Sequence, residues 1–216
     1  MKAPVIILLG MLGIGLAGCV TVPPKDYTEF RKSRPRSILV LPPGNQTTDI
    51  QAPYSLLTTI THPLAELGYY VFPVVMVDHL MKENGLALPD EMQRAPLEKL
   101  HEVFGADAVL YVTIEQYGSK YQVIVSNTTV KVRGKLVDAR TGVTLWEGQA
   151  LAQNAGQSGL IEALVTQVMN KLMDEAHMVA AMASYQLLMP PVPGQGFLRG
   201  PRHPEAGTDS VAVGLR

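Results

Sequence analysis

The hydrophobic pattern at the start of the folded region predicts a strand, a helix and a second strand. Residues 37–41 form a continuous apolar run, typical of a strand that is buried on both faces. Residues 53–67 place Leu or Ile at steps of three and four and end before Gly68, which predicts a helix that Pro63 should kink or shorten. Residues 69–74 are rich in aromatic and β-branched side chains and predict a second strand, parallel to the first in a βαβ unit.

Three further helices are predicted beyond the βαβ unit. Two short ones cover residues 77–84 and 96–104, and a glycine follows each of them. A long C-terminal helix is predicted to begin at Ser158, an N-cap residue, and to stop at the prolines of residues 190–193. Methionines widen its apolar stripe, which favours core packing over a partner-binding face: Met169, Met173, Met178 and Met182.

The region between these helices is predicted to form an antiparallel meander. Apolar and polar residues alternate weakly over 107–116 and clearly over 121–137, and 143–152 forms the return strand. Gly118-Ser119 would make the first hairpin turn, and residues 138–142 would make the second. The predicted fold class is therefore α/β (α+β): a mixed sheet of about five strands, in which the βαβ unit precedes the meander, backed by helices.

The first 18 residues match a lipoprotein signal peptide. Lys2 supplies a positive charge, and residues 5–17 are almost wholly apolar or Gly, a run that is short for a spanning helix. The run ends in the lipobox Leu16-Ala17-Gly18-Cys19, whose cysteine would carry the lipid. Cys19 is the only cysteine, so a disulfide within the chain is impossible. An uncleaved anchor, or an ordinary signal with a chance cysteine, is the alternative.

The mature chain is expected to have three parts. Residues 19–36 form a lipid-anchored tether, whose basic residues could lie near anionic head groups, although a solvated linker fits the pattern as well. Residues 37–189 form a single α/β domain, and the Pro/Gly-rich residues 190–216 form a disordered tail. No Asp follows Cys19 to retain the protein in the inner membrane. We therefore expect an outer-membrane anchor with the domain facing the periplasm, with surface exposure as an alternative.

Several segments resemble a family of bacterial lipoproteins of unknown function that includes a neisserial surface-antigen candidate. The resemblance runs from about Cys19 to Pro190 and rests on residues 37–43, 82–86, 104–111, 121–130 and 135–142. Part of it is also distantly similar to the periplasmic domain of the curli secretion lipoprotein and to the N-terminal domain of the Tol–Pal component TolB. The resemblance implies a mixed sheet backed by helices that serves assembly and protein contact. The loops are too short for the membrane hairpins of the curli channel, so no pore is expected.

No set of residues predicts a catalytic, cofactor or metal site. The five histidines lack the spacing of metal-binding pairs, and His62 and His79 are interpreted as surface or helix-end residues. Residues 156–159 lack the spacing of a nucleophile elbow, and residues 42–45 fit no nucleotide-binding loop. Trp146 is interpreted as a core residue, with ligand stacking as the alternative.

The remaining acidic pairs and the overall charge narrow the functional classes. Asp90-Glu91 and Asp174-Glu175 have polar neighbours and look solvated. With 18 basic and 19 acidic residues, the chain has no basic excess for nucleic acid. We therefore expect not an enzyme but an accessory lipoprotein that binds envelope proteins in an export or surface-assembly complex, with a homo-oligomer as one option. The alternative is a carrier or sensor for a small apolar or glycan ligand between sheet and helices, and an envelope hydrolase is expected least.

Overall fold

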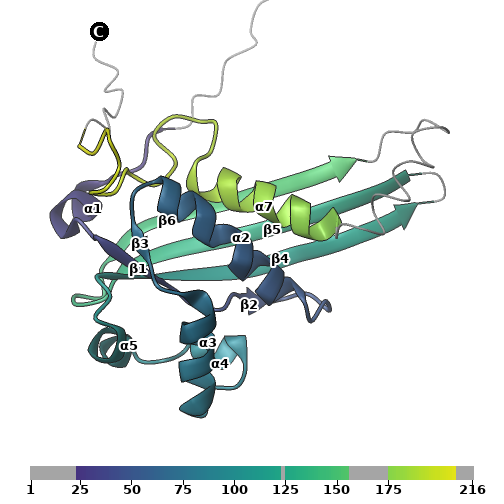
Figure 1. Ribbon diagram of the computed structural model, residues 1–216. Coiled ribbons are helices and arrows are strands. Elements are labelled where there is room, and N and C mark those ends of the chain that lie inside the picture. The colour runs from purple at the N-terminus through teal and green to yellow at the C-terminus, as the bar shows by residue number, and fades with distance from the viewer. Residues whose placement is uncertain (1–22, 123–124, 156–174, 208–216) are drawn as a thin grey trace, which may run out of the picture.

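The computed structural model describes residues 23–122, 125–155 and 175–207, which build a mixed six-stranded sheet with helices packed on it (Figure 1). The strands are β1 (Ser37–Val40), β2 (Gly44–Asn45), β3 (Tyr70–Val71), β4 (Ala108–Gln122), β5 (Val125–Asp138) and β6 (Thr144–Ala155). The described helices are α1 (Thr28–Ser33), α2 (Ala52–Glu66), α3 (Val74–Glu83), α4 (Pro89–Met92), α5 (Leu97–Phe104) and α7 (Glu175–Leu188). The order across the sheet is β3-β1-β4-β5-β6, and β2 pairs with β4.

The predicted βαβ unit is confirmed. β1 pairs in parallel with β3 on one side and with β4 on the other, and α2 connects the first pair. Pro63 lies inside α2, which continues to Glu66. β3 is shorter than predicted because α3 begins at Val74, directly after its N-cap Pro73 and three residues before the predicted start of that helix. Shortly after the predicted first strand, Gly44 and Asn45 form the unforeseen strand β2, which pairs with β4.

The antiparallel meander is confirmed, but its first turn lies elsewhere. The prediction of a turn at Gly118-Ser119 is wrong, because Gly118 pairs with Thr129 and the ladder continues to Gln122 and Val125. Gly118 has a φ of 109° within β4, a few residues after a register shift, so here the glycine marks an irregular strand instead of a turn. The second turn forms as predicted, with Gly142 at a φ of 73°.

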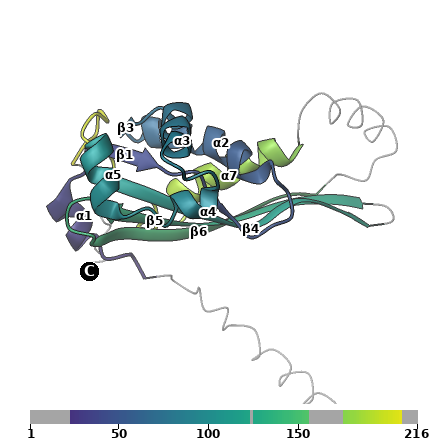
Figure 2. The same cartoon turned by 90° about the horizontal axis from the view of Figure 1, so that it is seen from below.

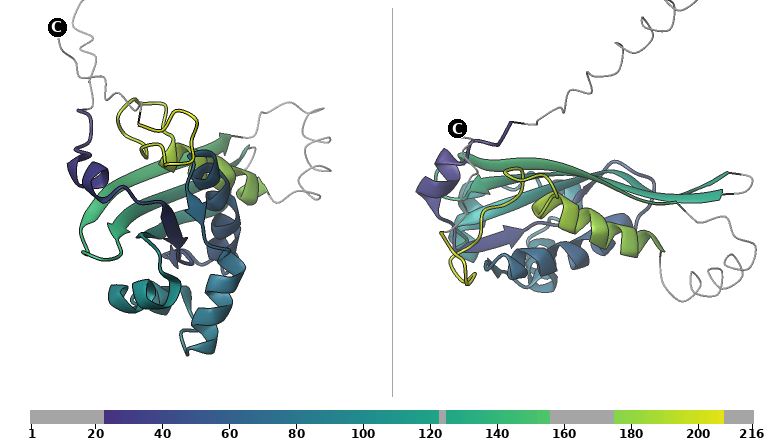
Figure 3. Two further views of the ribbon diagram at one scale, coloured as in Figure 1. Left: turned by 60° about the vertical axis from the view of Figure 1, so that its left-hand side comes forward. Right: turned by 90° about the horizontal axis from the view of Figure 1, so that it is seen from above.

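Helices cover the two faces of the sheet unequally. α2 and α7 lie on one face, where side chains such as Leu56, Leu110 and Val132 are fully buried in the larger core. On the other face, α3, α4 and α5 pack against β1 and the start of β4, so β1 is buried on both sides, as its apolar run predicts. Among the described elements, no helix covers that second face along the rest of β5 and β6 (Figures 2 and 3).

The chain ends differ from the expected tether and tail. Residues 23–36 contain α1, and Phe30 is only 3% exposed. Residues 190–207 also pack on the domain, and Phe197 is 7% exposed. The two segments meet where the rings of Phe30 and Phe197 stand 5.8 Å apart, edge to face. We call residues 23–36 and 190–207 together the terminal layer.

An aromatic cluster fixes the terminal layer to the sheet. The Phe197 ring lies 4.5 Å from Trp146 and 6.2 Å from Tyr69, centroid to centroid. The Trp146 indole N–H donates to the Gln195 carbonyl at 3.1 Å, and the Tyr69 hydroxyl donates to the Leu198 carbonyl at 2.7 Å. The terminal layer is therefore part of the folded domain, and the part of the chain available as a free tether is much shorter than predicted.

Candidate functional site

The two edges of the sheet are built very differently. β3 has two residues, and the terminal layer lies beside it: Gly200 donates to the Leu67 carbonyl at 2.7 Å, and the Arg202 guanidinium lies 5.6 Å from the Tyr70 ring. β6 has twelve residues and pairs with β5 on one side. In the described part of the chain, no strand pairs with its other side. We call residues 149–154 of β6 the open edge.

The composition of β6 lacks the usual protection of a free strand. Natural edge strands are commonly blunted by Lys, Pro, bulges or extreme shortness, because unpaired backbone groups attract other strands. β6 contains no Lys and no Pro, Glu147 is its only charged residue, and its register shift at Leu145 lies before the open edge. Gln149, Leu151 and Gln153 point to the uncovered face and are exposed, and Leu151 is 50% exposed. The open edge is therefore suited to pairing with another strand.

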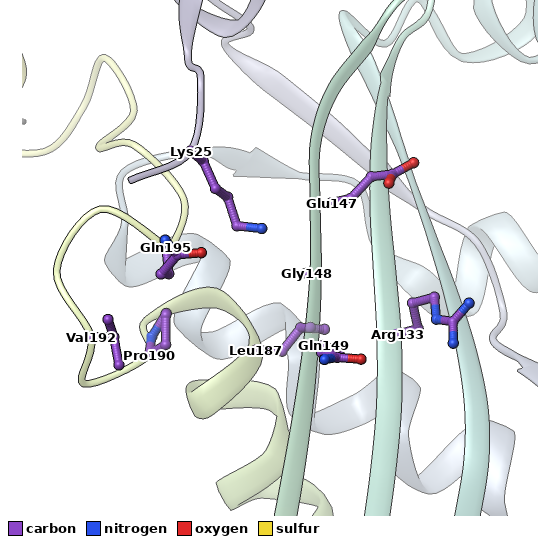
Figure 4. Close-up of a pocket in the computed structure, with 9 residues that line it drawn as sticks. All are labelled: Lys25, Arg133, Glu147, Gly148, Gln149, Leu187, Pro190, Val192 and Gln195. Carbon is purple, nitrogen blue, oxygen red and sulfur yellow. The ribbon is translucent and has the colours of Figure 1, made fainter. Parts of the chain in front are cut away.

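A groove of about 590 Å³ adjoins the start of the open edge (Figure 4). The terminal layer contributes Lys25 and Gln195 to one wall, and β6 contributes Glu147 and Gln149 to the other. The complete lining is Lys25, Arg133, Glu147, Gly148, Gln149, Leu187, Pro190, Val192 and Gln195. Because the groove is open, and charged and amide side chains share its lining with apolar ones, it extends the surface at the sheet edge and does not enclose an apolar ligand.

Trp146 and Gly148 shape the groove from beneath. A Cβ added to Gly148 would stand 2.3 Å from the Trp146 ring, so the ring lies directly against the glycine backbone. A Cβ added to Gly134, opposite Gly148 on β5, would stand 3.2 Å from Trp146 and 3.1 Å from Leu187 of α7, a tight but longer contact. Trp146 itself is 3% exposed, so its interpretation as a core residue is confirmed.

The uncovered face of the meander carries paired charges. The Glu115 carboxylate accepts from Lys131 at 2.8 Å and from Arg133 at 2.6 Å. The hydrogen bond from Lys131, with the charges of both cations, lowers the pKa of Glu115. Lys135 and Glu147 form a looser pair at 3.8 Å. Such exposed pairs add little stability, but they give the face a defined pattern of charges.

Several residues singled out in the sequence lie away from this edge. The side chains of His62 and His79 are 67% and 64% exposed, as predicted. Met178 and Met182 are 37% and 46% exposed, so the prediction that they pack in the core is wrong, and they form an apolar ridge on the outside of α7. The lipobox Leu16-Ala17-Gly18-Cys19, the N-cap candidate Ser158, and Met169, Met173 and Asp174 lie outside the described residues.

A serine–histidine pair lies between α2 and α7. The Ser55 hydroxyl is 2.8 Å from the His177 Nδ1 and accepts from the Tyr117 hydroxyl at 2.7 Å. Two further contacts, Thr59 with Ser184 and His62 with Tyr185, continue the series along the helices. Among the described residues, no carboxylate contacts the His177 ring as an orienting third group. We interpret the series as hydrogen bonds that fasten α2 to α7.

No group of three or more His, Asp or Glu side chains in the described part of the chain could hold a metal ion. No helix in it is long and apolar enough to cross a membrane.

The chain matches the family model "Putative lipoprotein GNA1162-like" over residues 25–202. It is 41% identical over 212 residues to the "Putative lipoprotein NMB1124/NMB1162" of Neisseria meningitidis serogroup B, covering 95% of this chain and 98% of the relative. The chain belongs to the GNA1162-like lipoprotein family. The family resemblance predicted from the sequence is thus confirmed.

One solved structure agrees with this family. The crystal structure of lipoprotein GNA1162 from Neisseria meningitidis aligns with a TM-score of 0.54 at 41% identity, over 65% of this chain and all of that chain. A PelC dodecamer structure from Paraburkholderia phytofirmans aligns with a TM-score of 0.48 at 17% identity, over 78% of this chain and 94% of that chain. Neither the open edge nor the terminal layer was evident from the sequence. The one available signal for the edge is that β6 lacks Lys and Pro.

Proposed function

We propose that this GNA1162-like lipoprotein is attached to the outer membrane through lipid on Cys19 and presents a protein-binding domain to the periplasm. The partner would add a strand to the open edge and contact the neighbouring charged face and groove. The single observation that carries this proposal is a twelve-residue edge strand without Lys or Pro. A role as an accessory of an envelope export or surface-assembly complex fits such a domain, and a second copy of the chain is one candidate partner.

Strand addition explains why the open edge is polar yet unprotected. Backbone hydrogen bonds supply affinity in this mode, and the side chains that point from the strand supply specificity. Leu151 offers an exposed apolar contact, flanked by Gln149 and Gln153, whose amides can donate and accept. These side chains raise no barrier of like charge against an incoming strand.

The carrier alternative needs a cavity between the sheet and the helices. At Gly134, even one added carbon would stand only 3.1 Å from Leu187 and 3.2 Å from Trp146, so the sheet and α7 pack tightly there. The groove lies outside this packed region, and Lys25, Arg133 and Glu147 in its lining suit polar contacts. The partner we propose is therefore a protein and not a small apolar ligand.

The test compares charge insertion at the open edge with the same change elsewhere. Full-length lipoprotein is crosslinked in native envelopes, solubilised and purified, and the proteins recovered with it are quantified by mass spectrometry. Leu151→Lys should reduce partner recovery about tenfold, because a lysine on the edge opposes strand addition. Val103→Lys, at another exposed apolar residue (59% exposed), should retain the wild-type recovery. Equal recovery with both variants would sink the proposal.

A further inference from the structure

The distance between the lipid site and the folded domain is short. The Gln195 side-chain amide donates to the Pro23 carbonyl at 2.6 Å, and the Lys25 N–H donates to the Gly194 carbonyl at 3.0 Å. Pro23 therefore belongs to the folded surface, and four residue steps separate it from Cys19. At roughly 3.5 Å per residue these steps span at most about 14 Å. If lipid is attached at Cys19, the terminal layer must stay next to the bilayer.

Charge is divided unevenly between the terminal layer and the rest of the domain. Residues 23–36 and 190–207 contain seven Lys or Arg and three Asp or Glu, a formal charge of +4. Residues 37–189 contain nine basic and fifteen acidic residues, a formal charge of −6. The near-zero net charge of the whole chain therefore conceals a basic part, and that part lies closest to the lipid site.

Five of the seven basic residues of the terminal layer are exposed, and Lys25 and Arg199 are half-buried. Arg31, Lys32, Arg34 and Arg36 are exposed on and after α1, while Phe30 faces the core. Arg202 is exposed in the C-terminal segment of the layer. The described chain ends lie together near α1, at the opposite end of the sheet from the tips of β4 and β5 (Figures 1 and 3).

We propose that the terminal layer docks on the anionic head groups of the membrane that holds the lipid. This proposal rests on lipid attachment at Cys19, as in the proposed function. Basic side chains next to a lipid anchor gain from a negative bilayer surface, and salt weakens the attraction within a Debye length. Docking would place the start of β6, near α1, closer to the bilayer than its end (Figure 1). The open edge would then remain accessible to a periplasmic partner.

The test uses the mature lipidated protein in vesicles of phosphatidylcholine alone or with about one-third phosphatidylglycerol, an anionic lipid. A fluorophore is attached at Pro201→Cys in the terminal layer or at Gln153→Cys in the open edge, both exposed positions. Nitroxide-labelled head groups report which label lies at the surface. We expect several-fold stronger quenching at residue 201 than at 153 in anionic vesicles, and a decline at residue 201 when lipid charge is removed or salt is raised.

Reversing the charge of basic residues in the terminal layer distinguishes docking on the head groups from mere closeness to the bilayer caused by the lipid anchor. Arg36→Glu with Arg202→Glu should lower quenching at residue 201 in anionic vesicles to the level seen in neutral ones. Arg94→Glu with Lys99→Glu, a matched reversal outside the layer, should leave quenching unchanged. Docking would be overturned, and the lipid anchor would stand, if vesicle-bound protein showed no more quenching at residue 201 than at residue 153. The same conclusion would follow if quenching at residue 201 did not depend on lipid charge. Protein that fails to float with the vesicles would overturn both proposals.

Discussion

An edge strand exposes unpaired backbone N–H and C=O groups, and the two edges of this sheet differ in how these groups are covered. The β3 edge is two residues long, and residues 198–203 of the terminal layer lie beside it. The β6 edge is twelve residues long and has no described strand beyond it. Both edges belong to the same sheet, so they differ in length and covering within one fold. The difference supports the proposal that a partner binds at β6.

The terminal layer lies beside the β3 edge, and disrupting its packing should cause the largest loss of unfolding free energy. Phe197→Ala removes the ring that contacts Phe30, Tyr69 and Trp146, and should cost about 3–5 kcal/mol of unfolding free energy. Val192→Ala, at a 42% exposed residue of the same layer, should change stability by less than about 0.5 kcal/mol. Urea unfolding of both variants measures the difference. A Phe197→Ala variant as stable as Val192→Ala would show that the layer does not close this edge.

Changes to the packing beneath the groove, at the β6 edge, should cause a smaller loss of unfolding free energy. Gly148→Ala places a methyl group against the Trp146 ring and should cost about 1–3 kcal/mol through forced displacement of the indole. Gly134→Ala meets the same ring and Leu187 at longer distances, so its cost should be lower. Because Trp146 is the only tryptophan, its emission should shift to the red in Gly148→Ala more than in Gly134→Ala. The reverse order would contradict this account of the groove.

Asp138 links the terminal layer to the second turn and makes stability depend on pH. Burial raises the pKa of Asp138, but hydrogen bonds from Ser33 and from the Thr141 and Arg140 N–H groups outweigh it and hold the pKa below its usual value. A lowered folded-state pKa adds stability above the unfolded value of about 3.9, and this contribution is lost as pH falls through the folded pKa.

Asp138→Asn should therefore lose about 1 kcal/mol at neutral pH and show a weaker decline in stability below about pH 4 than the wild type. Unfolding measured across this range tests the prediction. Asp90→Asn, at an exposed residue, is the control and should follow the wild-type curve. If the stability of Asp138→Asn fell with pH in parallel with that of the wild type, Asp138 would not be the source of the pH dependence.

The smallest expected effect on stability comes from the open edge itself. Leu151→Lys adds a charge to an exposed side chain of a strand that pairs on one side, so unfolding free energy should change by less than about 0.5 kcal/mol. A large loss of stability would mean that this residue supports the fold and would remove it as a clean probe of binding.

Local sequence patterns predicted those elements whose conformation and buried face are both determined by a few neighbouring residues. The apolar run of β1, the periodic Leu and Ile residues of α2 and the turn at Gly142 are each encoded within a few residues. The terminal layer was missed because Phe30 and Phe197 are isolated aromatic residues among basic, Pro and Gly residues, and each becomes buried only against a distant part of the chain. The open edge was missed because strand order is a property of the whole sheet.

Site-specific photocrosslinking tests the functional difference between the two edges most directly. Benzoylphenylalanine is placed at Gln149 and Gln153 on β6, and at Tyr70, a 45% exposed residue of β3, in lipoprotein expressed in its native envelope. The account predicts discrete protein adducts at residues 149 and 153 that disappear when Leu151→Lys is added, and none at residue 70. Adducts at residue 70 alone, or equally at both edges, would contradict the claim that β6 is the binding edge.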